Sequence, residues 1–424
     1  MTNFLDKIFL RSQNFDYITR NLKNLSIQSS TDRIFEAING YSANSEVRYV
    51  GGCIRKVIKN EIVDDIDLAT NLNPFEICEA LKNNEINFYK TGFKHGTITA
   101  VIDEQKYEIT SLRKDIKTDG RHAEVEFSKD WKEDAARRDF SINSIYSDRD
   151  GNLFDPHNGK KDLEQGEINF IGDVETRIKE DYLRILRYVR FYLNYSKQKH
   201  NSQIIKTIKK NIDGISKISS ERLLDELKKL FKSGNFLRLL KDKYSLELIE
   251  IIFPQLKKLH RLKKLNSYAI KSFNEIDFAF LLSLLVIDET DNTYYFFYKF
   301  NLSKKDQKRL KFIDHFYKEK VKIKCFNEKN LNKILYFEGR QAVIDILKFK
   351  LFTSNKVEKS LIKMLEVYKD KKIPNIPVAA NDLMLKYKIP EGKSLGNKLK
   401  KLEKFWVENN FIITEKQIKK IVKN

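Results

Sequence analysis

The chain has 424 residues, more than one ordinary domain holds, and 41% of them are hydrophobic, so it can bury sizeable cores. With only 15 glycines and 6 prolines, it does not suit a turn-rich all-β fold or long disordered linkers. The formal net charge of +21 indicates a polyanionic partner, with nucleic acid first and an acidic membrane surface second, unless the lysines only solvate helix faces.

The cysteines and the N-terminal segment bear on the cellular setting. Cys53, Cys78 and Cys325 are odd in number and far apart, which is typical of neither a disulfide framework nor a zinc cluster. The segment MTNFLDKIFLRSQNF lacks the continuous apolar core of a signal peptide. No apolar run approaches the ~18 residues of a membrane helix. We therefore expect a cytoplasmic protein that does not enter a membrane.

Short runs that alternate in side-chain character mark the first part of the chain. Glu46–Val50, Gly96–Asp103 and Lys106–Ser111 are rich in Val, Ile, Thr and Tyr, which predicts three strands. The last two are separated only by Asp103–Gln105, so they are predicted to form a hairpin.

Helical patterns begin within this part and then take over. A helix is predicted after Asn73, because Pro74 suits a first turn, with Phe75, Cys78 and Leu81 spaced to share one face. From about Asp162 the strand signal fades. The predicted fold class is therefore α+β, followed by an all-α, basic C-terminal region. The later predicted helices are Glu180–Tyr192, Ser220–Phe231, Phe278–Ile287, Val357–Lys369 and Ile413–Val422.

A glycine pair follows the first predicted strand. Gly51 and Gly52 stand where a strand would turn into a helix, and backbone N–H groups at such a turn can approach phosphate oxygens closely. Arg55, on the first turn of that helix, adds a donor for a triphosphate. A strand-to-helix turn needs glycine in any protein, so this pair alone does not specify a ligand.

Three acidic residues extend the pattern. If Asp65-Ile66-Asp67 forms a strand, both carboxylates share one face and Ile66 points into the core. Glu108, in a later predicted strand, can add a third carboxylate. Like charges this close need a cation, and oxygen ligands suit Mg²⁺. Each acid taken singly is more typical of a solvated surface, but together, beside a glycine turn, they predict a magnesium site for nucleotidyl transfer.

Taken together, the motifs resemble those of the bacterial class II tRNA nucleotidyltransferases, the CCA-adding enzymes, and of the related bacterial poly(A) polymerases in the DNA polymerase β superfamily. The resemblance runs from Gly51 to Leu230 and implies a polymerase β-like nucleotidyltransferase domain at the start of the chain. The matching segments occur in family order: GGCIR, DDIDLAT, TGFKHGTITAVID, YEITSLR, TDGRHAEVEF, EDAARRDFSINSIY, FDPHNGKKDLEQG, EDYLRILRYVRF and SSERLLDELKKL.

This resemblance implies roles for single residues. Asp65 and Asp67 are expected to hold magnesium, with Glu108 as the third catalytic carboxylate. The expected phosphate contacts of the nucleotide are Gly52, Arg55 and Arg138. Asp139 and Asn143 are expected at the ribose, whose 2′-OH distinguishes ribonucleotides.

The segment Glu180–Arg190 resembles the protein template of the family, in which amino acids replace a nucleic-acid template. On one continuous helix, Asp181 and Arg184 share a face and offer an acceptor beside a forked donor. That pair suits cytosine and adenine better than guanine or uracil. Arg187 lies near this face and Arg190 about half a turn away, and both are expected at the nucleotide. Without the other motifs, the pair would be an ordinary surface ion pair.

Two positions depart from the family pattern. Lys56 stands where the family usually has aspartate after the arginine of the first motif, so the support of the glycine turn is expected to differ. Ser141 replaces the usual threonine and keeps its hydroxyl.

The expected organisation has three parts: a nucleotidyltransferase head at 30–155, a helical neck with the nucleotide-selecting helix at 156–235, and a helical, RNA-binding body and tail at 236–424. The expected reaction is CCA addition to the tRNA 3′ end from CTP and ATP by two-metal transfer, with Mg²⁺ as cofactor and no protein partner. The segment between Arg113 and Trp131, which the family uses to switch specificity, is not shortened and favours full CCA addition.

Two alternatives remain open. The first is a sibling enzyme with a different product, which is a poly(A) polymerase or a partial A-adding or CC-adding nucleotidyltransferase. The second is a non-catalytic RNA-binding protein, against which the intact Asp65, Asp67 and Glu108 argue.

Overall fold

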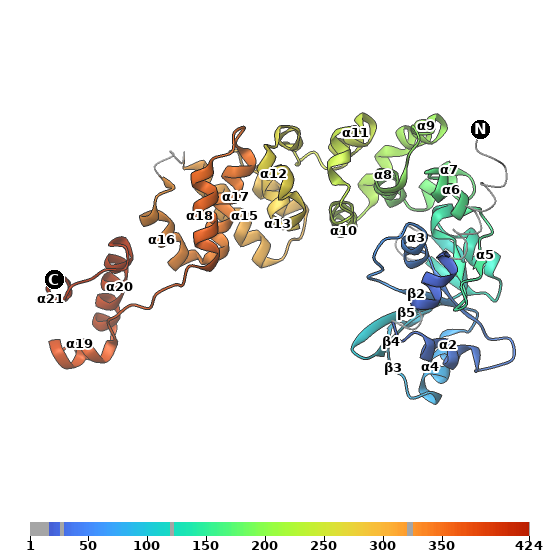
Figure 1. Ribbon diagram of the computed structural model, residues 1–424, viewed down its shortest axis with the longest axis horizontal. Helices are drawn as coiled ribbons and strands as arrows, with labels where there is room; N and C mark the ends of the chain where they lie inside the picture. The colour runs from blue at the N-terminus through green and yellow to red at the C-terminus, as the bar shows by residue number, and fades with distance from the viewer. Residues whose placement is uncertain (1–16, 26–28, 119–122, 320–324, 424) are drawn as a thin grey trace. The chain divides into compact units, whose positions relative to one another are not determined.

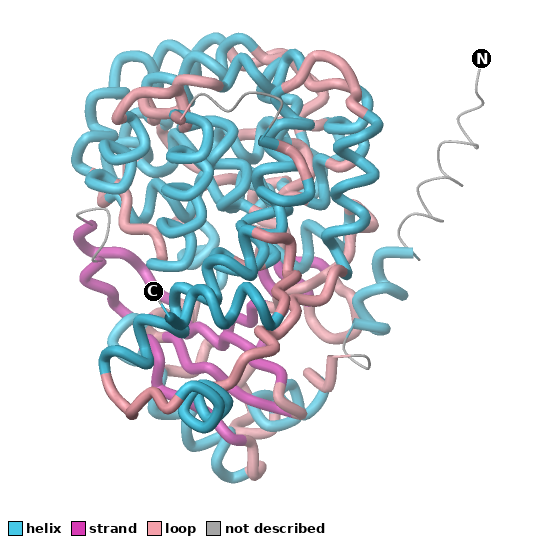
Figure 2. The backbone as a smooth tube through the Cα atoms, turned by 90° about the vertical axis from the view of Figure 1, so that its left-hand side faces the viewer, coloured by secondary structure: helices cyan, strands magenta, loops and turns pink. Residues whose placement is uncertain are grey.

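A computed structural model describes residues 17–25, 29–118, 123–319 and 325–423, so the N-terminal segment quoted above lies outside it. The chain divides into two compact units, residues 1–233 and 234–424. The first contains a mixed sheet (Figure 1), whereas the second, over its described residues, is built from helices and loops without strands (Figure 2). The predicted α+β part followed by an all-α region is confirmed.

Seven strands of the first unit form one sheet in the order β3-β4-β5-β2-β1-β8-β9, in which β2 and β5 are parallel and the other neighbours antiparallel. A separate hairpin pairs β6 with β7, and its tip, residues 119–122 within the segment tied to specificity above, lies outside the described residues. The strands are β1 (Val47–Val50), β2 (Asp67–Thr70), β3 (Asn87–Gly92), β4 (Thr97–Ile102), β5 (Gln105–Ser111), β6 (Arg113–Thr118), β7 (Ala123–Phe127), β8 (Tyr146–Ser147) and β9 (Leu153–Phe154).

The three strands predicted from alternation are β1, β4 and β5, and the predicted hairpin joins the last two. Its turn consists of Asp103 and Glu104, both in the left-handed region with φ of 49° and 64°. Ile102 pairs with Gln105, so Gln105 already belongs to the strand. Positive φ at both turn residues matches the twist of the flanking strands, which explains so tight a connection.

One face of the sheet packs against α2 (Asp32–Asn39) and α4 (Pro74–Asn83), which lie together beside β3 and β4 in Figure 1. The core between these layers is built from the buried apolar residues of β1, β2, β4 and β5 and from the inner faces of the two helices. Part of the opposite face packs in a smaller apolar cluster of Val50, Ala69, Leu112, Ala135 and Tyr146, and the rest of that face carries polar residues.

Helix α4 begins where the sequence predicted it. Asn73 caps the helix in a capping box with Glu76, which satisfies backbone donors of the first turn. The predicted apolar face is wrong at one residue, because Phe75 is 71% exposed. Ile77 and Leu81, four residues apart, are the residues that face the sheet, since both are fully buried.

The remaining helices of the first unit follow the sheet strands or connect them. Figure 1 shows α8 and α10 next to each other beyond the sheet, and the two helices are in contact. These elements are α3 (Gly52–Ile58), η1 (Phe93–His95), α5 (Trp131–Ala136), η2 (Ser141–Asn143), α6 (Gly159–Gln165), α7 (Val174–Glu180), α8 (Leu183–Tyr195), α9 (Ser202–Asn211), η3 (Ile212–Lys217) and α10 (Ser220–Lys232).

The helix predicted over Glu180–Tyr192 is wrong at its start. Helix α7 ends at Glu180, Asp181 is extended with φ −153°, and α8 begins at Leu183. The Asp181 carboxylate accepts a hydrogen bond from the Leu183 N–H at 3.1 Å. Aspartate competes with helical backbone bonding in this way, which is why it favours helix starts over interiors.

The second unit contains the predicted helices α13, α18 and α21, with bounds shifted by one or two residues. Its apolar residues form two further cores, one around α16–α18 and one around α19–α21. None of the described helices combines the length and apolar character that crossing a bilayer requires. The elements are η4 (Phe236–Leu240), α11 (Lys243–Ile252), η5 (Leu259–Lys264), α12 (Ser267–Lys271), η6 (Phe273–Glu275), α13 (Phe278–Val286), α14 (Asn292–Lys299), α15 (Lys304–Lys318), α16 (Glu328–Glu338), α17 (Arg340–Thr353), α18 (Lys359–Asp370), α19 (Ala380–Tyr387), α20 (Lys393–Glu408) and α21 (Glu415–Lys423).

Candidate active site

The glycine pair forms the turn between β1 and α3. Gly51 has φ 70° and ψ −110°, a conformation that side chains with a Cβ rarely adopt. Gly52 is the first residue of α3, and a Cβ built there meets no atom within 4 Å. The backbone conformation therefore requires glycine at position 51. At position 52 the glycine instead leaves open space in front of the helix.

The acidic residues come from the edge of this turn, but they do not share one strand. Asp67 is the first residue of β2 and pairs directly with Glu108 on the parallel strand β5. Asp65 and Ile66 lie in the preceding loop, where Asp65 is exposed, so the prediction that Asp65-Ile66-Asp67 forms a strand is wrong for both. The reason is that Gly51 turns the chain away after β1, which leaves the residues before Asp67 without that partner. Ile66 is buried, as predicted.

The charges of Asp65 and Glu108 nevertheless act on Asp67. Burial, and then the charges of Asp65 and Glu108, raise the pKa of Asp67 to about 6. The cost of ionising Asp67 is one that a bound cation would relieve, so this donor set fits a divalent metal. Among the described side chains, however, no three acidic, histidine or cysteine groups already stand close enough to hold a metal.

Arg138 is fixed by a buried carboxylate. Asp134 accepts bonds from Arg138 Nη2 at 2.9 Å, from Arg137 Nε at 2.8 Å and from the Tyr146 hydroxyl at 2.7 Å. Burial opposes ionisation of Asp134, but the two arginines outweigh it and hold its pKa well below the usual range. Asp134 thus aligns both arginines at the end of α5, with Arg138 Nη1 beside Gly51.

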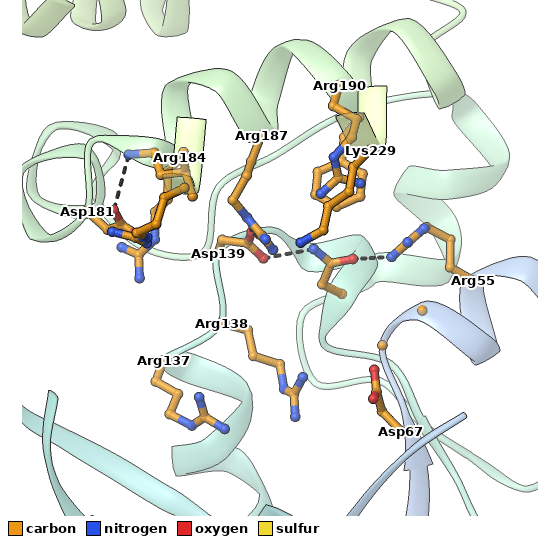
Figure 3. A pocket seen from close by; sticks show the side chains of 16 residues that line it. Arg55, Asp67, Arg137, Arg138, Asp139, Asp181, Arg184, Arg187, Arg190 and Lys229 are labelled. Atoms are coloured by element: carbon orange, nitrogen blue, oxygen red, sulfur yellow. Dashed lines mark hydrogen bonds and ion pairs between the residues drawn. The ribbon is translucent and has the colours of Figure 1, made fainter. Parts of the chain in front are cut away.

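Asp139 and Asn143 are bonded to each other and to two arginines. The Asn143 amide donates to Asp139 Oδ1 at 2.8 Å, Arg187 Nε donates to Asp139 Oδ2 at 2.6 Å, and Arg55 donates to the Asn143 side-chain oxygen. Burial disfavours the charged form of Asp139, but Arg187 and Asn143 hold its pKa at about 2. This chain of bonds links α3, η2 and α8 around one space (Figure 3).

Asp181 and Arg184 do not bond through their side chains in this structure. Arg184 donates instead to Glu180 Oε2 at 2.6 Å and to the Arg177 carbonyl oxygen at 2.7 Å. Asp181 Oδ2 accepts from Arg222 of α10 at 2.7 Å. Both groups still line the same cavity, so the structure brings the pair to one place without the expected shared helix face.

Arg190 is held by α10 as well. It donates to the buried carboxylate of Glu226, and its guanidinium lies 4.1 Å from the centre of the Phe191 ring. The guanidinium of Arg55 lies over the same ring at 4.9 Å. A buried aromatic face thus stabilises two cations that approach from different helices.

These side chains surround a cavity of about 440 Å³, in which Arg55, Arg138, Asp139 and Asp181 are labelled in Figure 3. Half of its lining residues are arginine or lysine, so it is strongly cationic and suits a polyphosphate. Glu108 and Asp65 are not among the lining residues, whereas the other predicted site residues are. The lining residues are Gly51, Gly52, Arg55, Asp67, Arg137, Arg138, Asp139, Asn143, Asp181, Leu183, Arg184, Arg187, Arg190, Phe191, Arg222 and Lys229.

The structure adds residues that the sequence reasoning did not single out. Arg222, Glu226 and Lys229 stand four and three residues apart on α10 and reach the cavity or its arginines. Their helical spacing within the matched segment SSERLLDELKKL is the signal that could have identified them. Arg137 and Asp134 were within reach in the same way, since both belong to EDAARRDF.

Lys56, the departure from the family pattern, forms an ion pair with Asp64 in the loop before β2. The side chain of Asp64 is 72% exposed, so this pair contributes little to stability. It does connect the helix after the glycine turn with the loop that carries Asp65.

Comparison with known families gives two matches along the chain. The family described as "Poly A polymerase head domain" matches residues 47–169. The family described as "Probable RNA and SrmB- binding site of polymerase A" matches residues 201–259. Together they cover the sheet, the last helices of the first unit and the start of the second unit.

Individual relatives extend over most of the chain. The human "CCA tRNA nucleotidyltransferase 1, mitochondrial" is 32% identical over 390 residues, which are 90% of this chain and 87% of the relative. The "CCA-adding enzyme" of Staphylococcus haemolyticus is 32% identical over 310 residues, 71% of this chain and 72% of that protein.

Solved structures share the fold. The Bacillus stearothermophilus CCA-adding enzyme in complex with CTP has a TM-score of 0.70 at 20% identity, covering 93% of this chain and 97% of that chain. The Thermotoga maritima CCA-adding enzyme complexed with tRNA has a TM-score of 0.58 at 19% identity, covering 92% and 94%.

Proposed function

We propose a reaction for this chain from one premise: it belongs to the family of CCA-adding tRNA nucleotidyltransferases and is an RNA nucleotidyltransferase. The proposed reaction adds C, C and A to the 3′ end of tRNA from CTP and ATP. The observation that carries it is the cationic cavity at the glycine turn, beside the paired Asp67 and Glu108.

The chemistry follows from charge. The RNA 3′ oxygen attacks the α-phosphorus of the nucleotide, a new P–O bond forms, the bond to the bridging oxygen breaks and pyrophosphate leaves. Arg55 and Arg138 hold the triphosphate, and Gly52 lets it approach the start of α3 because no Cβ is in the way. Asp134 already holds Arg138 in position, and Asn143 already holds Arg55, so neither arginine has to be reoriented when the triphosphate binds.

We propose Mg²⁺ as the cation, held by Asp65 and Asp67 with Glu108 beside it. When bound, magnesium would lower the pKa of the attacking hydroxyl and neutralise the triphosphate. The raised pKa of Asp67 supports a cation at this place, because the ionised carboxylate is otherwise unfavourable.

Nucleotide selection is proposed for the side chains at the start of α8. Asp181 accepts from and Arg184 donates to the edge of cytosine or adenine, and Asp139 and Asn143 position the ribose. Arg187 and Arg190 complete the cationic wall. Since Arg222 occupies one oxygen of Asp181 in this structure, a base must share that oxygen or use the other one.

The division of the chain and its location are also proposals. The head at 30–155 contains the sheet strands, the neck at 156–235 contains α8 and α10, and the body and tail at 236–424 supply a helical surface for RNA. Cytoplasmic location is supported by three cysteines that are all free thiols, as a reducing compartment maintains.

Incubation of the full chain with tRNA that lacks its last three nucleotides, Mg²⁺ and labelled CTP and ATP tests the reaction. We expect the tRNA to gain three nucleotides, and no more, only when CTP and ATP are both present. Long runs from ATP alone would instead indicate poly(A) synthesis, and products that stop after the two C residues even when both nucleotides are present would indicate a partial enzyme. As the matched control, Asp67→Ala should abolish addition, whereas Asp64→Ala, one side chain outside the proposed carboxylate set, should retain it.

A further inference from the structure

The strand register aligns four residues across the sheet. Tyr89 of β3 pairs with Thr99 of β4, Thr99 pairs with Glu108 of β5, and Glu108 pairs with Asp67 of β2. Directly paired residues on neighbouring strands project from the same face. Tyr89 therefore stands on the carboxylate face of the sheet, two strands beyond Glu108 and on the edge strand.

This part of the face is polar. The Thr91 and Thr99 hydroxyls are 2.7 Å apart, and those of Thr97 and Thr110 are 3.1 Å apart. The alternate residues of the same strands lie in the core on the other face. Tyr89 is 61% exposed, so its ring is presented to solvent beside these hydroxyls.

The position of the cavity indicates from which side of the sheet the RNA approaches the carboxylates. The cationic cavity includes Gly51 and Gly52, which follow β1, so it lies on the β1 side of Asp67. Pyrophosphate leaves toward those cations. In an in-line displacement the nucleophile approaches from the side opposite to the leaving group. The RNA 3′ end must therefore arrive from the side of β5, β4 and β3.

We infer that the polar face of β3, β4 and β5 is the track on which the unpaired 3′ end of the RNA lies, with Tyr89 as the platform for a base. This inference rests on the proposed function. Neighbouring strands are about 4.8 Å apart, so Tyr89 is about 10 Å from Glu108 along the face. The base on Tyr89 therefore belongs to a nucleotide before the terminal one, whose own 3′ oxygen must reach the carboxylates.

The chemistry of the face fits an unpaired strand. A tyrosine ring stacks on any base, and the hydroxyl of the exposed Thr91 can donate to or accept from ribose and phosphate oxygens. Such contacts do not depend on sequence, which suits an RNA end whose last nucleotide changes after every addition.

The test compares Tyr89→Ala and Tyr89→Phe with the unchanged protein in steady-state addition of CTP. Phe75→Ala is the matched control, because Phe75 is another largely exposed aromatic residue, on α4 at the core face of the sheet. We expect Tyr89→Ala to raise the KM for RNA about tenfold, as loss of one stacked base does, and to leave the KM for CTP unchanged. Tyr89→Phe and Phe75→Ala should behave like the unchanged protein.

Stacking on Tyr89 can be measured directly with tRNA in which 2-aminopurine replaces one base near the 3′ end, at a nucleotide before the terminal one. Its fluorescence should be quenched on binding to the unchanged protein and to Tyr89→Phe, but not to Tyr89→Ala. Equal RNA KM and equal quenching in the alanine variant would overturn the inference, as would an equal rise of both KM values. If the unchanged protein adds no nucleotide at all, the proposed function fails instead.

Discussion

Asp67 and Glu108 are directly paired on adjacent parallel strands, so their carboxylates leave the sheet on the same face. Neighbouring strands place such residues about 5 Å apart. Two acids at this separation destabilise the empty site, and the same repulsion makes it ready for a cation. A cation bound between them, as the proposed function requires, would relieve that repulsion.

The first prediction concerns stability without metal. Because the pKa of Asp67 is raised to about 6, the folded state binds its proton more tightly than the unfolded chain does, and stability falls as pH rises between about 4 and 6. Asp67→Asn removes this cost. We expect its free energy of unfolding at pH 7, measured by urea denaturation in chelator, to exceed that of the unchanged protein by about 1–2 kcal/mol. Added Mg²⁺ should narrow the gap by stabilising only the unchanged protein. A variant less stable than its parent in chelator would contradict this account.

The second prediction separates the two glycines. Gly51→Ala forces an alanine to φ 70° and should lower the free energy of unfolding by about 1–2 kcal/mol. Gly52→Ala should keep that stability, since its Cβ meets no protein atom within 4 Å, but should raise the KM for CTP and ATP at least tenfold because the methyl group enters the cavity. Thermal unfolding and initial rates measure the two effects. Normal nucleotide KM values in Gly52→Ala would show that the triphosphate lies elsewhere.

The sequence was sufficient for three strands of the sheet and for most residues that line the cavity. Alternation locates β1, β4 and β5 because one face of each strand is buried, and that burial leaves a period in the sequence. The roles of Gly51, Gly52 and Arg55 could also be predicted from the sequence, because they depend on the local geometry of the turn.

The sequence did not predict where local hydrogen bonds replace those of a regular strand or helix. Asp65 and Asp181 both fit a regular pattern, yet each lies just outside its element, because strand pairing starts at Asp67 and the Asp181 side chain bonds to the Leu183 N–H. The contacts of Arg222 and Glu226 could not be derived either. They depend on which face of α10 meets α8, a relationship between segments that periodicity leaves undetermined.

The third prediction tests the buried carboxylate below Arg138. Asp134→Asn leaves Arg137 and Arg138 without their charged partner and should cost about 3–5 kcal/mol of unfolding free energy at pH 7. The pKa of Asp134 is depressed on folding, so its contribution is present above the unfolded value near 4 and is lost as pH falls below it. The difference between the two proteins should therefore shrink from pH 5 to pH 3 in urea titrations. Asp150→Asn, at an exposed aspartate, should change stability by less than about 0.5 kcal/mol. An acid-independent difference would mean that Asp134 is not ionised in the folded protein.

The fourth prediction concerns how Arg184 is aimed. Its guanidinium is held by Glu180 at 2.6 Å and not by Asp181, and the Arg184 side chain is only 11% exposed. Glu180→Gln removes the charge that fixes this donor while leaving the Asp181 acceptor in place. We expect the ratio of kcat/KM for CTP over UTP to fall about tenfold, equivalent to about 1.4 kcal/mol of lost discrimination. Asp181→Asn is the paired variant: it converts one acceptor into a donor with Arg184 still held, so it should lower the rate with CTP and raise the rate with UTP. If Glu180→Gln keeps its thermal stability and still rejects UTP as the unchanged protein does, Arg184 is aimed by the Arg177 carbonyl oxygen alone, and Glu180 has no part in selection.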